Sequence, residues 1–318
     1  MNRLYDLASL TKPLVTAPLA LAFLDLDADR RWALGFHARE GPLTVRQLLS
    51  HRSGLPPWRP FTGESVAEQL RRPVPEHPLL RPAAPGLATY SDLNYRLLAA
   101  LLETETGIPF AKLGQASGLS PAPWPSAPIE IPNGPDAVAW TLATEAPLPA
   151  RDPRLPHDAN ARAGMQRHAG FGATAPQLRA TLARWMASGW PDRMAVEAAM
   201  GEGEACWGLG LQAALAGTGR FGQLLSGIPA GFGLHILEDS SESTPPAAPP
   251  VDGGPGSASG WWFHLGYTGP ALFCRPSDRS CIGLLLNRRG PGGALLDAES
   301  LRARRWALLA PFVGQSSG

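Results

Sequence analysis

Four residues near the start of the chain, Ser9-Leu10-Thr11-Lys12, place a hydroxyl and an amine three positions apart. If a helix begins at Ser9, positions i and i+3 share one face, so the lysine amine can reach the serine hydroxyl. A serine becomes an effective nucleophile when a neighbouring base takes its proton, and a buried lysine near other cations can lose its own proton near neutral pH. The spacing therefore predicts Ser9 as a nucleophile that Lys12 activates.

The same tetrapeptide is also typical of an ordinary helix cap, so its weight depends on the rest of the chain. The chain contains only two lysines, Lys12 and Lys112, which makes a chance lysine one turn after a serine improbable. Further blocks follow along the chain: Tyr5–Pro13, Leu43–Pro56, Tyr90-Ser91-Asp92, His157–Ala161 with His168–Phe171, His264–Gly269 and Asn287-Arg288.

Together these blocks resemble the motifs of serine β-lactamase-like and penicillin-binding-protein-like hydrolases of the class C type. Ser-x-x-Lys is a signature of such enzymes. Tyr90-Ser91-Asp92 is similar to their Tyr-x-Asn motif, and His264-Leu265-Gly266 is similar to their Lys/His-Thr-Gly strand motif. The resemblance covers residues 5 to 289, and it implies a β-lactamase/transpeptidase-like fold with an acyl-enzyme formed on Ser9.

The resemblance also implies roles for other residues. Tyr90 would lie opposite Lys12 and exchange the proton of Ser9, with its phenolate favoured by the lysine charge. The backbone N–H groups of Ser9 and Tyr267 would form the oxyanion hole. Gly266 would allow the substrate to approach its strand closely.

Three positions near the expected cleft bear on the substrate. Leu265 stands where relatives usually carry a hydroxyl, which weakens the hold on a penicillin-like carboxylate. Asp92 replaces the asparagine of relatives and adds a negative charge to the substrate-binding side. His264 would line the pocket and could bind a substrate carboxylate if protonated; the alternative is a strand-face histidine with no such duty.

Metal and cofactor sites are not expected. His157, Asp158 and His168 invite a metal interpretation, but their spacing matches no standard zinc pattern, and a loop that walls one side of the cleft is preferred. The three cysteines form no Cys-x-x-Cys pattern, and Cys274 and Cys281 are expected to be small core residues.

Helices and strands that would position these residues can be read from periodicity. Apolar residues at helical spacing predict helices over 9–24, 44–51, 93–106, 174–188 and 297–312. Thr44 and Thr174 are the expected N-caps, and Gly107 and Gly189 the expected stops. Short apolar runs between turn residues predict antiparallel strands at 207–213, 220–226, 231–237, 261–266, 270–275 and 280–287.

The expected architecture is α+β, with an antiparallel sheet flanked by helices. A mostly helical region would cover 1–205, with the nucleophile helix at 9–24, and the sheet with a C-terminal helix would cover 206–318. The Ser/Pro/Gly-rich stretch 239–260 is expected to be a flexible loop. The resemblance implies a helix and a pair of sheet strands before the nucleophile, but only eight residues precede Ser9, so either the chain starts further upstream or these elements are missing. If they are missing, the sheet has an unpaired edge that favours dimerisation or aggregation.

Composition narrows the range of partners. The net charge of +1 gives no basis for binding nucleic acid or an anionic membrane surface. The expected partner is a small-molecule ester, amide or β-lactam, and no oligomeric state is indicated. No signal peptide opens the chain, so a cytoplasmic location is expected unless further residues precede it.

The sequence therefore predicts a serine hydrolase that cleaves an ester or an amide, as an esterase, a β-lactamase or a D-amino-acid peptidase. Esterase or peptidase activity is favoured because Leu265 weakens the carboxylate grip. A Ser-His-Asp hydrolase is the alternative enzyme class. The alternative outside enzymes is a catalytically inactive homologue with a binding or structural role, against which the joint presence of Ser9, Lys12 and Tyr90 argues.

Overall fold

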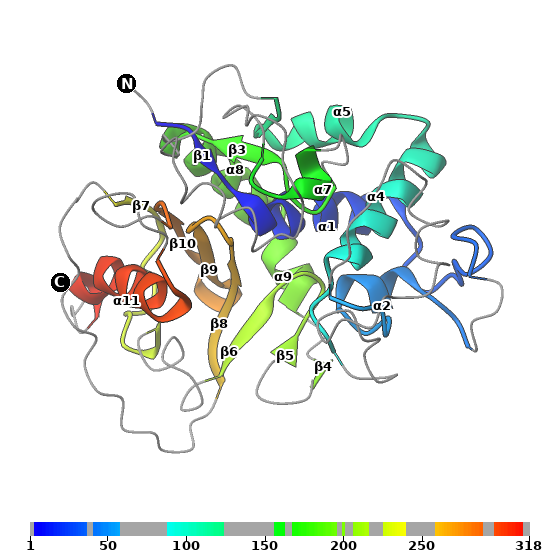
Figure 1. Ribbon diagram of the computed structural model, residues 1–318. Helices are drawn as coiled ribbons and strands as arrows, with labels where there is room; N and C mark the ends of the chain where they lie inside the picture. Colours follow the sequence, from blue (N-terminus) through cyan, green and yellow to red (C-terminus); the bar gives the residue numbers. More distant parts are fainter. Residues whose placement is uncertain are drawn as a thin grey trace.

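A computed structural model describes residues 3–36, 41–57, 88–123, 156–162, 167–195, 199–200, 206–215, 225–239, 258–288 and 296–313. Helices gather around one end of the molecule, and a sheet lies at the other with helices on both of its faces (Figure 1). The mixed α+β architecture expected from the sequence is therefore confirmed.

The segment that carries Ser9 is helical but irregular. A 3₁₀ turn spans Ala8–Leu10, a π-helical turn spans Lys12–Thr16, and α1 spans Ala17–Phe23. Proline cannot donate a backbone hydrogen bond, and Pro13 and Pro18 stand at the starts of the last two turns, where a missing donor costs least. The predicted helix over 9–24 is thus present, with its first two turns wound differently from an α-helix.

The predicted helix ends agree with the structure. α2 (Val45–Leu49) and α8 (Ala175–Ala187) each begin with a capping box, from Thr44 with Gln47 and from Thr174 with Gln177. α4 (Asp92–Thr106) ends at Gly107, whose φ of 67° is the left-handed conformation that favours glycine at this position. The other helices are α5 (Phe110–Gly114), α7 (Ala159–Arg162), α9 (Trp190–Ala195) and α11 (Ala298–Leu309), with 3₁₀ turns at Gln115–Ser117, Pro276–Asp278 and Ala310–Phe312.

The main sheet has the strand order β4-β5-β6-β8-β9-β10-β7. Its strands are β4 (Ala199–Met200), β5 (Cys206–Trp207), β6 (Gln212–Leu215), β7 (Leu234–Glu238), β8 (Ala258–Leu265), β9 (Ala271–Arg275) and β10 (Ser280–Leu285). All neighbours are antiparallel except β7, which pairs in parallel with β10. The edge of β10 that faces away from β9 is therefore paired with a strand that precedes β8 in the chain.

One strand prediction differs from the structure, and another is largely untested. The run 207–213 is split into β5 and β6, because Gly208 to Leu211 form the link between them. Most of the run 220–226 lies outside the described residues, as does most of the expected flexible loop at 239–260, whose last residues belong to β8.

A small sheet, not expected from the sequence, joins three distant segments in the order β1-β3-β2. Its strands are β1 (Tyr5–Asp6), β2 (Ser120–Pro121) and β3 (Phe171–Ala173). Tyr5 pairs with Ala173 and Asp6 with Gly172, so the residues just before the nucleophile are fixed beside the chain that follows His168.

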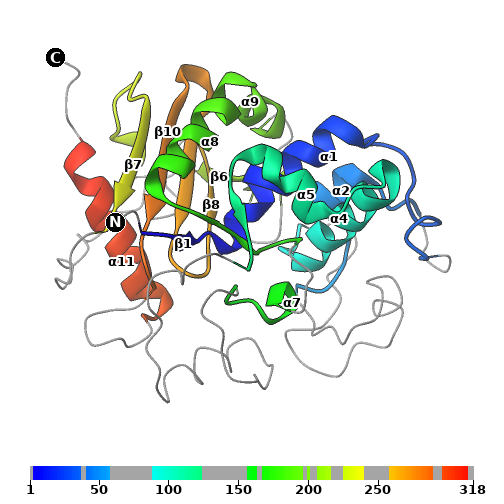
Figure 2. The ribbon, with the colours of Figure 1, turned by 90° about the horizontal axis from the view of Figure 1, so that it is seen from above.

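Helices cover both faces of the main sheet (Figure 2). On one face α8 packs against β7 and β10, where Leu178 and Leu182 meet Gly283 of β10. On the other face Leu301, Trp306 and Leu309 of α11 join a cluster of buried side chains from β8, β9 and β10. Cys274 and Cys281 lie directly opposite each other on β9 and β10, fully buried and unbridged, which confirms them as core residues.

Candidate active site

Ser9 lies at the start of the helical segment, next to a fully buried lysine. Lys12 Nζ donates a hydrogen bond to Ser9 Oγ at 2.9 Å. Ala8, just before the serine, has a φ of 47°, which is unusual for a residue with a side chain. The Asp6 carboxylate accepts the N–H of Ala8 at 2.8 Å and so helps to hold this conformation. The predicted contact between Ser9 and Lys12 is therefore present.

The charge of Lys12 differs from the expectation. Asp92 Oδ1 lies 2.7 Å from Lys12 Nζ, and the carbonyl of His168 accepts a further hydrogen bond from Nζ at 3.2 Å. Burial disfavours the ammonium, but the Asp92 carboxylate outweighs it, and the pKa of Lys12 is raised above its usual value. The pKa of Asp92 is lowered, since Lys12 and His168 outweigh its burial. The pair is ionised, so Lys12 is held as an ammonium and not as the neutral base that the sequence suggested.

Tyr90 faces the same ammonium. Lys12 Nζ lies 5.1 Å from the centre of the Tyr90 ring, and the phenol has hydrogen-bonding interactions with both Lys12 and Ser9. Burial raises the pKa of Tyr90 more than Lys12 lowers it, and Asp92 adds to the rise. The tyrosine is therefore neutral, not the phenolate expected from the lysine charge alone.

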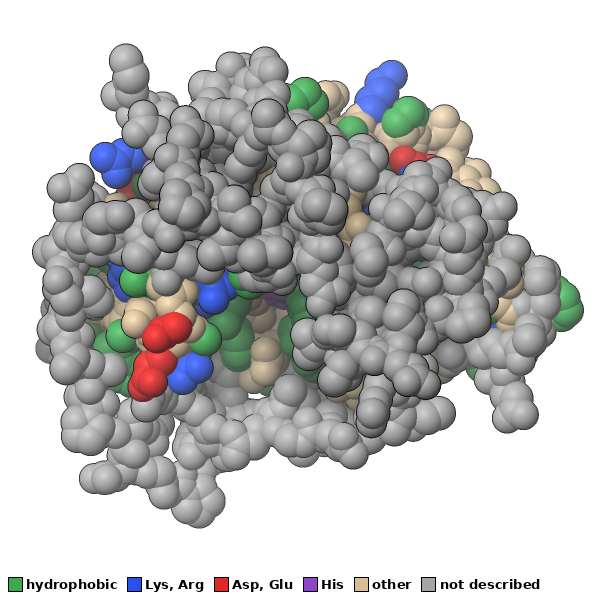
Figure 3. Space-filling model, viewed as in Figure 1, with side chains coloured by type: hydrophobic (Ala, Val, Ile, Leu, Met, Phe, Trp, Pro, Cys, Tyr) green, Lys and Arg blue, Asp and Glu red, His purple; other side chains and the backbone are tan. Residues whose placement is uncertain are grey.

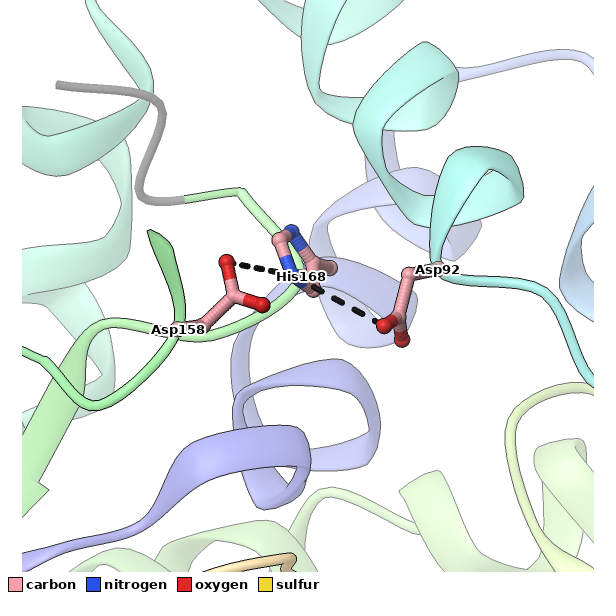
Figure 4. Close-up of side chains that lie close together, drawn as sticks. All are labelled: Asp92, Asp158 and His168. Atoms are coloured by element: carbon pink, nitrogen blue, oxygen red, sulfur yellow. Dashed lines mark ion pairs between the residues drawn. The ribbon is translucent and has the colours of Figure 1, made fainter. Parts of the chain in front are cut away.

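A charged cluster continues from Asp92 away from Ser9. His168 Nε2 lies 3.1 Å from Asp158 Oδ1 and 3.9 Å from Asp92 Oδ2. Figure 4 shows the imidazole between the two carboxylates, which come from the start of α4 and from the loop before α7. These three side chains could in principle hold a metal ion, since their ligand atoms lie within 4.8 Å of one another. The ammonium of Lys12 already neutralises Asp92, however, and a divalent ion would have to lie beside it.

Aromatic rings gather around Tyr90. The ring of His51 lies 4.7 Å from those of Tyr90 and Trp207, and the ring of His264 lies 5.9 Å from Tyr90 and 6.0 Å from Trp207. On the face seen in Figure 3, hydrophobic side chains flank a hollow that has a histidine at its base. His51 is packed at the end of α2 with its Nδ1 accepting the N–H of Ser91 at 3.0 Å.

The surroundings of His264 determine its charge. Burial, together with the nearby charge of Lys12, lowers the pKa of His264 to about 3. The imidazole is therefore neutral at physiological pH, which favours the alternative of a strand-face histidine over a cation that binds a substrate carboxylate. Its Nε2 is buried with no hydrogen-bond partner in the described part of the chain.

The turn between β8 and β9 approaches the nucleophile segment closely. A Cβ on Gly266 would lie 2.9 Å from the carbonyl oxygen of Leu7, so only glycine fits here. Thr268 Oγ1 donates to the carbonyl of Asp6 at 2.7 Å, and the buried Arg305 of α11 donates to the carbonyls of Gly266 and Gly269. The turn that carries Tyr267 is thus fixed against the residues before Ser9.

The two predicted oxyanion donors belong to the two segments that meet here. The first hydrogen bond of the helical segment runs from the N–H of Leu10 to the carbonyl of Leu7 at 2.9 Å. The N–H of Ser9 lies one residue before this bond, so the helical segment does not use it. Within the described residues, no backbone acceptor is found for the N–H of Tyr267. The Tyr267 ring stacks on His157 at 5.3 Å and lies 4.2 Å from the Arg288 guanidinium. His157 in turn contacts the Asp6 carboxylate at 3.0 Å.

The structure brings the sequence-predicted residues to one place: Ser9, Lys12, Tyr90, Asp92, His264, Gly266 and Tyr267. Asp92, expected on the substrate-binding side, is engaged by Lys12 instead. Asp6 and Arg305 were missed, because no local pattern marks a residue that supports a distant turn. None of the described helices is long and apolar enough to cross a membrane.

Comparisons with known proteins identify the family and the fold of the chain. A family model described as Beta-lactamase matches residues 1–304 of the chain, whereas no curated protein sequence matches it. The class C beta lactamase from Rhodobacter sphaeroides superposes with a TM-score of 0.57 at 19% identity, over 96% of this chain and 85% of that chain. The predicted β-lactamase/transpeptidase-like fold is confirmed.

Two further solved structures share the fold. The D-alanine carboxypeptidase AmpC from Burkholderia cenocepacia gives a TM-score of 0.51 at 17% identity, over 96% of this chain and 84% of that chain. The D-stereospecific amidohydrolase from Streptomyces sp. gives 0.50 at 17% identity, over 95% of this chain and 86% of that chain. Because related folds host different activities, the substrate has to be argued from the site itself.

Proposed function

Because the chain belongs to the β-lactamase family of serine hydrolases, we propose that it forms an acyl-enzyme on Ser9 and cleaves an ester or an amide. The observation that carries this proposal is the 2.9 Å hydrogen bond from Lys12 Nζ to Ser9 Oγ, made by a fully buried ammonium that Asp92 neutralises. A fixed positive charge at this distance stabilises the negative charge that develops on the serine oxygen during attack.

Tyr90 supplies the proton path. Ser9 Oγ attacks the substrate carbonyl carbon, and its proton passes to the Tyr90 oxygen while the Tyr90 proton passes to the leaving oxygen or nitrogen. The bond from the carbonyl carbon to the leaving group then breaks, and the leaving group departs as a neutral alcohol or amine. Tyr90 is neutral before and after this transfer, which agrees with its raised pKa. In deacylation a water replaces the leaving group, and the same transfers run in reverse.

The N–H groups of Ser9 and Tyr267 are the proposed oxyanion donors. Gly266 supports this role because its lack of a side chain lets the strand end approach the nucleophile segment. Each preorganised amide donor of this kind stabilises the transition state by about 3–4 kcal/mol.

The surroundings of Ser9 favour a substrate without a carboxylate next to the scissile bond. His264 is neutral and buried, and Leu265 offers no hydroxyl. Rings of Tyr90 and Trp207 provide an apolar wall instead. We therefore favour a neutral ester or amide over a penicillin, whose carboxylate would lose its hydration without gaining a charged partner.

Mass spectrometry of the intact protein tests the proposal. Samples are incubated with a fluorophosphonate, with p-nitrophenyl acetate and with benzylpenicillin, using the wild type, Ser9→Ala and, as a matched control, Ser117→Ala. The Ser9 oxygen would bond to phosphorus with loss of fluoride, giving an adduct that maps to Ser9. We expect this adduct in the wild type and in Ser117→Ala, none in Ser9→Ala, ester turnover that depends on Ser9, and no penicillin adduct.

Two results would contradict the proposal. The chain also contains a Gly-x-Ser-x-Gly spacing at 314–318, so an adduct on Ser316 in place of Ser9 would favour the Ser-His-Asp alternative. A folded protein that reacts with none of the reagents would favour an inactive homologue. A penicillin adduct on Ser9 would leave the acyl-enzyme standing but overturn the preference for substrates without a carboxylate.

A further inference from the structure

The buried cluster beside Lys12 extends through two residues that the proposed mechanism does not use. From Ser9 the contacts run to Lys12 at 2.9 Å, to Asp92 at 2.7 Å, to His168 at 3.9 Å and to Asp158 at 3.1 Å. Asp158 and His168 lie in separate segments on either side of α7, and both are almost fully buried. The two side chains meet only because the chain folds back beside the start of α4 (Figure 4).

Each member of the cluster contacts more than one neighbour. Asp92 turns Oδ1 to Lys12 and Oδ2 toward His168, so both of its oxygens face a neighbour. Asp158 Oδ1 accepts the N–H of Ala161 at 2.8 Å, which anchors this carboxylate to the first turn of α7. Residue 168 touches Lys12 through its carbonyl and Asp92 through its ring, and so contacts both partners of the ion pair.

Burial makes this arrangement sensitive to any change. Burial alone would raise the pKa of Asp158, but His168 and His157 hold it well below its usual range. A carboxylate that is both ionised and buried needs a fixed partner, and the same holds for Asp92. A shift of about 1 Å in Asp92 would carry Lys12 Nζ out of line with Ser9 Oγ, and misplacement of this size can cost about 100-fold in rate.

From this geometry we infer that Asp158 and His168 are positioning residues, which fix the Asp92 carboxylate and through it align Lys12 with Ser9. The inference rests on the proposed function, since it assigns to them the alignment of that nucleophile. Neither residue touches the substrate. Their role is to keep the ion pair in one orientation while the charge on Ser9 changes.

A double-mutant cycle tests the inference with the full-length protein. The rate constant and the apparent affinity for fluorophosphonate labelling are measured for Asp158→Asn, His168→Gln and His168→Ala, each alone and combined with Asp92→Asn. Asp278→Asn serves as a matched control, since this aspartate pairs with Arg275 away from the cluster. Unfolding midpoints are recorded for every variant.

We expect each single substitution at 158 or 168 to lower the labelling rate constant about 10- to 100-fold with little change in apparent affinity. His168→Gln, which keeps an N–H donor, should lose less than His168→Ala. In the Asp92→Asn background the same substitutions should change the rate less than about twofold, because the residue through which they act is gone. Asp278→Asn should label like the wild type.

The outcomes separate this inference from the proposed function. If the wild type is not labelled at Ser9, the proposed function fails and this inference fails with it. If the wild type is labelled but the single variants keep its rate, or their losses add to that of Asp92→Asn, the inference is wrong and the function stands. A wild-type rate that falls on chelation with EDTA and returns with Zn²⁺ would replace the positioning role by a cation site.

Discussion

Buried titratable side chains lie on two sides of Tyr90, and they are charged on one side and neutral on the other. On one side Lys12, Asp92 and Asp158 have pKa values shifted toward their charged forms, although all three are largely or fully buried. On the other side His51 and His264 are equally buried, and their pKa values are lowered so that they are neutral. Burial is common to both sides, so the difference comes from the neighbouring charges: Asp92 outweighs burial at Lys12, whereas Lys12 adds to the effect of burial at His51 and His264.

The comparison also explains the state of Tyr90, which lies between the two sides. Its phenol interacts with Lys12, as a member of the charged side would, but its ring packs on His51 and Trp207. The aromatic surroundings prevail, and the tyrosine keeps its proton. A neutral tyrosine next to a fixed ammonium can pass a proton on without holding a charge, which is the role proposed for it.

Removing the ammonium of Lys12 should have the largest effect, because it is the positive charge next to Ser9. Lys12→Met keeps a long unbranched side chain but leaves Ser9 without its positive neighbour, so we expect fluorophosphonate labelling to slow about 1000-fold or more. The chain offers one matched control, Lys112→Met, because this second lysine is exposed on α5. Equal labelling rates in the two variants would remove Lys12 from the mechanism.

Removing the Asp92 carboxylate should favour the neutral form of Lys12, so that the charged side loses its charge as the aromatic side has. Asp92→Asn leaves a buried ammonium unpaired, and we expect the free energy of unfolding at pH 7 to fall by about 3–5 kcal/mol. In the variant the folded-state pKa of Lys12 should drop below its unfolded value, so folding would release a proton and the loss should shrink as pH rises toward 10.

Denaturant unfolding at pH 7, 8.5 and 10 measures this loss. The control is Asp27→Asn, which breaks an exposed ion pair with Arg46 and should leave the free energy of unfolding nearly unchanged. A deficit in Asp92→Asn that stays constant across this pH range would mean that Lys12 keeps its proton without Asp92.

The neutral state of His264 on the aromatic side should make the free energy of unfolding depend on pH in acid. The unfolded chain protonates His264 below pH 6.5, whereas the folded chain, with a pKa of about 3 for this residue, does not. The contribution of His264 to stability is therefore complete above pH 6.5 and falls by about 1.4 kcal/mol per pH unit below it. His264→Gln should flatten the decline in unfolding free energy between pH 6 and pH 4 by this slope, measured with urea. An unchanged slope would mean that His264 titrates normally in the folded protein.

The smallest effect is expected for Tyr95, and its comparison with Tyr90 distinguishes a structural tyrosine from one that takes part in the reaction. Tyr95 OH donates to the carbonyl of Leu49 at 3.1 Å, and its ring lies 5.8 Å from Lys12 Nζ. Tyr95→Phe should cost about 1 kcal/mol of stability and leave the labelling rate unchanged. Tyr90→Phe should instead slow ester turnover, because it removes the proton path. Equal effects of the two substitutions on turnover would contradict the role of Tyr90.

Local rules predicted the parts of the fold and site that depend on neighbours in sequence. The spacing of Ser9 and Lys12 predicted their contact, and Thr44, Thr174 and Gly107 predicted helix ends, because each effect acts within one turn. The resemblance to a family predicted which distant segments meet.

Ionisation states could not be predicted in this way. The charge of Lys12 depends on burial and on Asp92, which is remote along the chain, and the sequence suggested a neutral amine where the structure has an ammonium. The same applies to His264, whose neutrality follows from the nearby Lys12 and from its depth in the fold. The parallel pairing of β7 was also missed, since periodicity predicts a strand but not its direction.

The parallel pairing of β7 with β10 has a consequence for folding. β8, β9 and β10 form a meander with short turns, so their contacts close small loops and can form early. β7 precedes β8 in the chain yet must dock on the far side of β10, after the meander is in place. It should therefore be the last strand to join the sheet and the first to leave. A chain that has lost only β7 would present the backbone of β10 to another molecule, so the lifetime of this pairing would set the rate at which the folded protein enters aggregation.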